Sequence, residues 1–268
     1  MVNNQSKVTP KHSAWIGASL IAVIIIFFWL VAPIAQDPNY HLFSDNNTLL
    51  AVPNFWNVLS NLPFLFVGLF GLLQLQRSQL QILASNRQAY VIFFIGIALV
   101  AFGSGYYHLK PSNQTLVWDR LPMTLAFMAF MAFMAFMALC SMLVSEFLSE
   151  TWGKRLLYPL LIVGLSSVLY WDFTESHGVG DLRFYALVQF IPVIAIPIIL
   201  LGCKSSFNSI SGYWWLLAFY LLAKVLEYFD AQIHQLLAIM SGHPLKHIAA
   251  ATGVALLLKF YRQRRKTA

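Results

Sequence analysis

Three histidines, a serine and an aspartate are spaced as the residues of a metal site would be. His243 and His247 are four positions apart, so a helix would place both on one face, with Cβ atoms about 5–6 Å apart. Ser104 precedes His108 by the same interval, and Asp119 follows later in the chain. Three protein ligands and one open coordination position are typical of a catalytic zinc site. The pattern therefore predicts a metal-dependent hydrolase.

Each of these residues also has a simpler interpretation. The HxxxH spacing also occurs by chance, and this chain lacks the glutamate of the HExxH metalloproteases. Histidines that are buried in a protein core and hydrogen-bonded there could show the same spacing. Ser104 could be a small packing residue, a hydroxyl donor to a developing oxyanion, or part of a Ser-His-Asp triad that leaves two histidines unexplained. Asp119 is expected to begin a helix, either as a simple cap or as the general base for a zinc-activated water.

The composition indicates that these residues lie on helices that cross a membrane. Of the 268 residues, 59% are hydrophobic and 10% are charged, whereas soluble domains have about 25% charged residues. The sequence therefore predicts an all-α polytopic membrane protein. Eight apolar segments approach the ~20 residues that a bilayer requires: 14–35, 55–75, 88–108, 119–145, 156–172, 183–202, 212–236 and 244–261. The first segment could be a signal peptide, but its length favours a retained helix.

The distribution of lysine and arginine predicts the orientation. These residues are concentrated at the chain ends and in alternate loops, which should be cytoplasmic, so both termini are predicted inside and the histidines near the outer face. The net charge of +7 does not indicate nucleic acid as a partner, because the basic residues occupy short loops and the tail. Anionic lipid headgroups are the predicted neighbours of four tail residues: Arg262, Arg264, Arg265 and Lys266.

A polar stripe interrupts segment 212–236. It consists of Lys224, Glu227, Asp230 and His234, at intervals of three and four residues. Such groups usually face the interior of a helix bundle, where they could form a structural pair, line a cavity or orient the zinc ligands from a second shell. His41, Asp45 and the stretch 171–181 are expected to be ordinary solvated loop.

The ordered set of motifs resembles a known family. The motifs are Asn54–Asn61, Ser104 with His108, Asp119, and His243 with His247. Together they resemble the alkaline ceramidases and the wider superfamily of seven-helix membrane hydrolases that includes the adiponectin-type receptors. The resemblance covers about 54–261. It implies a seven-helix transmembrane bundle, zinc held by His108, His243 and His247, and Ser104 and Asp119 beside the metal. It also implies a membrane lipid substrate whose amide is cleaved to a fatty acid and a sphingoid base.

The resemblance has departures, and other functions stay open. The eukaryotic enzymes have an acidic N-terminal stretch that binds calcium and ends in a glutamate, where this chain has Asn54, so no calcium site is predicted. The chain looks more like bacterial members, which suggests the inner membrane. We expect a tail with an extra helix (1–45), a hydrolase core (46–261) and a basic tail (262–268). A receptor with structural zinc and a proton-coupled transporter using the polar stripe are the alternatives.

Overall fold

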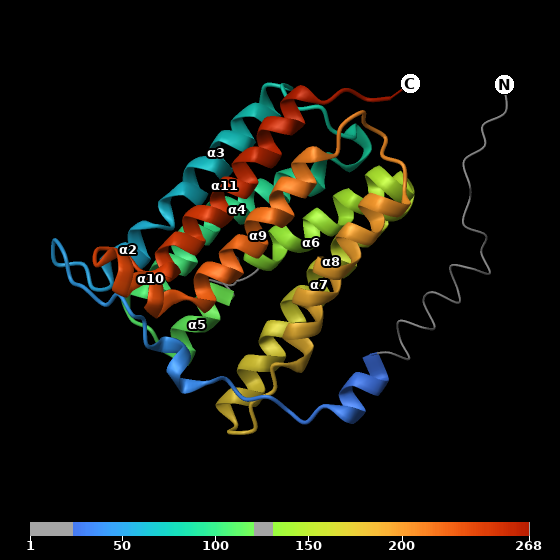
Figure 1. Ribbon diagram of the computed structural model, residues 1–268. Helices are drawn as coiled ribbons and strands as arrows, with labels where there is room; N and C mark the ends of the chain where they lie inside the picture. The colour runs from blue at the N-terminus through green and yellow to red at the C-terminus, as the bar shows by residue number, and fades with distance from the viewer. Residues whose placement is uncertain (1–23, 121–130, 268) are drawn as a thin grey trace, which may run out of the picture.

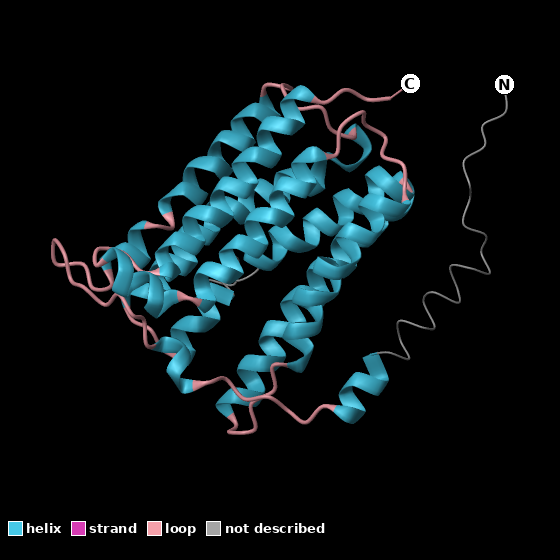
Figure 2. Ribbon diagram, viewed as in Figure 1, coloured by secondary structure: helices cyan, strands magenta, loops and turns pink. Residues whose placement is uncertain are grey.

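The computed structural model describes residues 24–120 and 131–267, and this part of the chain is helical, with no named strand (Figures 1 and 2). The predicted all-α membrane fold is confirmed. Four helical stretches are long and apolar enough to cross a bilayer: Phe55–Gln76, Ala84–Leu109, Glu150–Ser176 and Arg183–Gly202. At 1.5 Å per residue, a 23-residue helix reaches about 35 Å, which exceeds the ~30 Å hydrocarbon core.

The helices follow one another up and down the molecule (Figure 1). Their bounds are α2 (Phe55–Leu59), α3 (Leu62–Gln76), α4 (Arg87–Leu109), α5 (Asn113–Arg120), α6 (Met131–Leu143), α7 (Glu150–Ser176), α8 (Arg183–Gly202), α9 (Ser211–Tyr228), α10 (Asp230–Leu237) and α11 (Gly242–Gln263). Short turns are η1 (Pro38–His41), η2 (Ala84–Asn86) and the π-helical η3 (Val144–Leu148). α4 packs between α3 and α6, and α11 packs against α3 and α9.

Close helix contacts rely on small residues. A Cβ added to Gly68 of α3 would lie 2.4 Å from the backbone nitrogen of Ala98 in α4. Glycine lets these backbones approach, which favours helix association in a membrane, where lipid and protein are equally apolar. This contact sets α4, with His108 at its far end, firmly against α3.

Three predicted segments differ from the helices. The fourth predicted segment, 119–145, does not begin at Asp119. The helix there, α5, begins at Asn113, because Ser112 Oγ accepts the backbone N–H of Thr115 at 3.1 Å and so caps it. Its residues 121–130 lie outside the described part. Segment 212–236 is broken at Phe229, between α9 and α10. In segment 14–35, residues 14–23 are likewise not described, and the helical stretch 24–30 ends before residue 35.

The expectation of solvated loop holds for 177–179 but was wrong for the two ends of the stretch 171–181 and for Asp45. α7 continues to Ser176, Trp171 is fully buried, and Asp181 is buried by its contacts with Arg183 and Tyr170. Asp45 is also fully buried, and its backbone carbonyl accepts from Asn57 Nδ2 at 2.6 Å. His41 is partly covered and contacts α4 and α5 by hydrogen bonds to Tyr107 Oη and Asn113 Oδ1. These polar residues are therefore part of the structure at the histidine end.

The opposite end of the bundle holds a buried ion pair that corrects one prediction. Arg264 donates to both carboxylate oxygens of Glu146, at 2.6 and 2.8 Å, and both side chains are almost fully buried. Its guanidinium also lies over the rings of Phe207 and Tyr261. Arg264 is therefore not available to lipid headgroups. Its three basic neighbours in the tail are exposed: Arg262, Arg265 and Lys266.

Candidate metal centre

Two helices carry the three histidines to one place. His108 lies in the last turn of α4, and His243 and His247 lie in the first two turns of α11. Ser241 is the N-cap of α11 and accepts the backbone N–H of His243. A Cβ at Gly242 would meet the carbonyl oxygen of Leu226 at 2.0 Å. The absence of a side chain there lets the start of α11 press against the end of α9.

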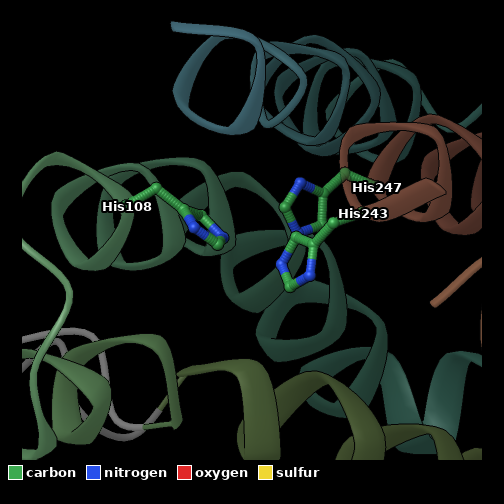
Figure 3. A group of neighbouring side chains, drawn as sticks. All are labelled: His108, His243 and His247. Carbon is green, nitrogen blue, oxygen red and sulfur yellow. The ribbon is translucent and has the colours of Figure 1, made fainter. Parts of the chain in front are cut away.

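The histidine rings point toward one another (Figure 3). One nitrogen from each lies within 4.8 Å of the others, and the ring centroids are 5.0 to 5.2 Å apart. His108 is fully buried, and His243 and His247 are 6% and 8% exposed. Three imidazole nitrogens gathered in this way are a ligand set that suits zinc.

The hydrogen bonding of these rings is incomplete, and a shared cation would give one nitrogen of each ring a partner. Both ring nitrogens of His108 and Nε2 of His243 are buried without a hydrogen-bond partner. Leaving a buried polar atom unpaired costs about 1–3 kcal/mol, and three such atoms in one cluster require an explanation. A divalent ion that prefers nitrogen ligands fits this donor set, because neutral imidazoles present lone pairs and no competing charge.

Ser60 fixes the ring of the third histidine. Its Oγ lies 2.8 Å from His247 Nδ1 and donates its own hydrogen to the carbonyl of Asn57 at 3.2 Å. A hydroxyl has one hydrogen, so when it donates to Asn57 it accepts from His247, and the imidazole proton is then on Nδ1. Nε2 is left as a bare lone pair, the form that binds a metal.

Two residues of the polar stripe contact the start of α11. Asp230 accepts the backbone N–H of His243 at 2.6 Å and that of Ser44 at 3.2 Å. Glu227 is paired with Lys224 at 2.8 Å and also accepts from Lys246, the neighbour of His247. These contacts tie α9 and α10 to the ligand-bearing turn.

An aromatic side chain covers the cluster. The ring of Phe43, 9% exposed, lies 4.8 Å from the ring of His108 and 4.7 Å from that of His243. The ring of Tyr107 packs on those of Phe43 and His108, and its hydroxyl forms a 3.0 Å hydrogen bond with Nδ1 of His41. The segment before α2 therefore shields the histidines from water.

Three other predicted site residues lie on neighbouring turns and helices: Ser104, Asp119 and His234. Ser104 is buried on α4, one turn before His108 and on the same face. Asp119 is half-buried in the last turn of α5, which packs against α4. His234 is half-buried on α10 and does not belong to the histidine cluster.

Ser60 and Phe43 were missed as site residues. Ser60 lies in the Asn54–Asn61 motif, and its place in that motif was the available signal, although nothing nearby in the sequence indicates a contact with His247. Phe43 carries no such signal, since one phenylalanine among 22 is not distinguished by type. Only the fold brings it onto the imidazoles.

The comparison with known proteins agrees with this geometry. A family model described as Ceramidase matches residues 44–263, which is well over half of the chain and contains all three histidines. No curated protein and no solved structure matches the chain.

Proposed function

Because the chain belongs to the ceramidase family, we propose that it hydrolyses the amide bond of an acylated lipid at the three-histidine site. Ceramidases release a fatty acid and a sphingoid amine, and that pair of products is the one we assign to this protein. His108, His243 and His247 would hold a zinc ion. The positive-inside distribution of charge would place this site at the outer face of a bacterial inner membrane, with both termini in the cytoplasm.

The unpaired nitrogens of the buried histidines are the single observation that carries the proposal. They come from two helices that are far apart in the sequence, and one nitrogen from each of the three rings lies within 4.8 Å of the other two. A bound zinc ion would supply a Lewis acid for the carbonyl and a water of lowered pKa. Ser60 and Asp230 support the proposal because they hold the ring of His247 and the backbone of His243 in place.

The reaction assigns distinct tasks to the neighbouring residues. The water oxygen forms a bond to the carbonyl carbon, the C–N bond breaks, and one proton passes from the water to the leaving amine. Asp119 would take that proton as general base and return it to the amine as general acid. Ser104 would donate a hydrogen bond to the oxygen that gains charge. Phe43 would exclude bulk water, which strengthens each of these interactions.

The polar stripe favours hydrolysis over proton-coupled transport. A proton path needs groups that are free to gain and lose protons, whereas both oxygens of Glu227 are held by lysines and both oxygens of Asp230 by backbone N–H groups. The stripe is thus better suited to positioning α11 than to carrying protons.

Metal content and turnover together test the proposal. We expect about one zinc per chain by elemental mass spectrometry of protein purified without chelator, lost in His243→Ala/His247→Ala. N-acyl sphingoid lipids should be hydrolysed by the wild type, and removal of zinc should abolish turnover that added zinc restores.

The matched control is His177→Ala, which removes an exposed histidine of the loop after α7. This variant should keep both zinc and turnover. Zinc without turnover on any amide lipid would favour the receptor alternative, and an absence of metal in the wild type would reject the proposed function.

A further inference from the structure

Two adjoining clefts lie at the end of α11 that is remote from the histidines. The first, of about 680 Å³, is lined by Gln79, Lys259, Arg262 and Gln263. The second, of about 300 Å³, is lined by the same Lys259 and Arg262 and by five apolar residues: Phe66, Val67, Phe70, Ala255 and Leu258. The two clefts therefore form one groove between α3 and α11, polar at one end and apolar at the other.

The polar end is positively charged and not neutralised by the protein. Lys259 and Arg262 lie one turn apart on α11, and neither has an ion pair within the described residues. Gln79 and Gln263 add amide N–H donors beside them. Two cations flanked by amides suit a phosphodiester and its polar substituents.

The apolar end lies on a face that points away from the bundle. Phe66 is 65% exposed and Phe70 is 45% exposed, both on a helical stretch that is apolar enough to span the membrane. In a bilayer this face meets acyl chains. A hydrocarbon chain lying between α3 and α11 would cover these rings and continue directly to the cations.

We propose that this groove binds an anionic glycerophospholipid, with its phosphate on Lys259 and Arg262 and one acyl chain along Phe66, Val67 and Phe70. Charge complementarity and the continuity of the apolar groove carry the assignment. The bound lipid is distinct from the substrate, because Arg262 lies fifteen residues beyond His247 on α11, or about 22 Å along the helix. The proposal does not depend on catalysis at the histidines.

The inner-leaflet position predicted from the basic loops agrees with this occupant. Anionic lipids give that surface a negative potential, and each basic residue near it contributes roughly a five-fold gain in affinity. Removal of both cations should therefore weaken binding roughly 30-fold.

Native mass spectrometry of the purified full-length protein tests the site. Phosphatidylglycerol and phosphatidylcholine of identical chains are titrated onto the wild type, Lys259→Ala/Arg262→Ala and Ala255→Phe. We expect the wild type to retain phosphatidylglycerol, the double variant to lose it, and Ala255→Phe to lose it as well because the added ring fills the groove with both charges kept. Zinc content and thermal unfolding should be unchanged in the double variant, which reports that it is folded.

The matched control is Lys154→Ala/Arg155→Ala, which removes two exposed cations from the start of α7, outside the groove. It should retain phosphatidylglycerol as the wild type does. Equal loss in this control would show general charge attraction and overturn the proposal, as would undiminished binding by Lys259→Ala/Arg262→Ala. If millimolar inorganic phosphate displaced the lipid and Ala255→Phe did not affect binding, the groove would be a site for a soluble anion, and the lipid proposal would be rejected.

Discussion

At the scale of single residues, the hydroxyl of Ser60 decides which nitrogen of His247 can face a cation. Ser60→Ala removes the acceptor for the Nδ1 proton, so the ring can rotate and change tautomer. Loss of such an outer partner typically weakens metal affinity 10–100-fold. We expect this decrease in zinc affinity, measured by competition with a chelator of known strength.

Ser60→Thr retains the hydroxyl and provides the matched control, with affinity near that of the wild type. Identical zinc affinity in Ser60→Ala would contradict the role of this hydrogen bond.

Ser104 and Asp119 should act on the chemical step and not on the metal. Ser104→Ala is expected to lower kcat about 10²–10³-fold through loss of one oxyanion donor, and Asp119→Asn about 10²–10⁴-fold through loss of the general base. Zinc content should stay at one per chain in both variants, because the three histidines that we assign as ligands are kept. Loss of zinc in parallel with turnover would instead make either residue part of the metal site.

The sequence was most informative where spacing along one helix carries the signal. His243 with His247, and Ser104 with His108, could be recognised because period 3.6 puts each pair on one face. The contacts of Ser60 with His247 and of Phe43 with His108 join distant parts of the chain, and no local pattern reports them. Arg264 was misassigned for the same reason. Its partner Glu146 is 118 residues away, so only its charge was visible.

At the scale of elements, one arginine fastens the N-terminal segment to α8. Arg183 donates to the carbonyls of Phe28 and Val31, at 3.0 and 2.6 Å, and its ion pair with Asp181 closes at 2.7 Å. Leu182 adds a backbone bond to Ile34. The guanidinium of Arg183 holds the pKa of Asp181 below its ordinary value.

The stabilisation by this pair should depend on pH in a defined direction. Because the pKa of Asp181 is depressed on folding, its contribution is complete above the ordinary carboxylate pKa of about 3.9 and disappears as pH falls through the lower folded value. Thermal unfolding should show Asp181→Asn less stable than the wild type from pH 5 to 8. The difference in stability between the two proteins should begin to shrink below about pH 4 and disappear once the pH is below the folded pKa of Asp181. A gap of constant size down to pH 3 would refute this account.

At the scale of the whole molecule, the ion pair of Arg264 and Glu146 joins the helices at the end of the bundle opposite the histidines. Removal of one partner leaves a buried charge, which costs about 3–5 kcal/mol, whereas replacement of both by apolar groups is often neutral. Arg264→Met should therefore lower the midpoint of thermal unfolding strongly, and Glu146→Leu/Arg264→Met should recover most of the loss. A double variant no more stable than Arg264→Met would show that the pair is not the cause.

The same pair has a consequence for the order in which the protein is made. Glu146 leaves the ribosome 118 residues before Arg264, and at 5–20 residues per second this interval lasts about 6–24 s. During that time Tyr90, already synthesised, is the hydrogen-bond partner available to the carboxylate, whereas its ion-pair partner Arg264 has not yet been made. We expect the far end of the bundle to stay open until α11 arrives, so that assembly of the bundle is completed by its last helix.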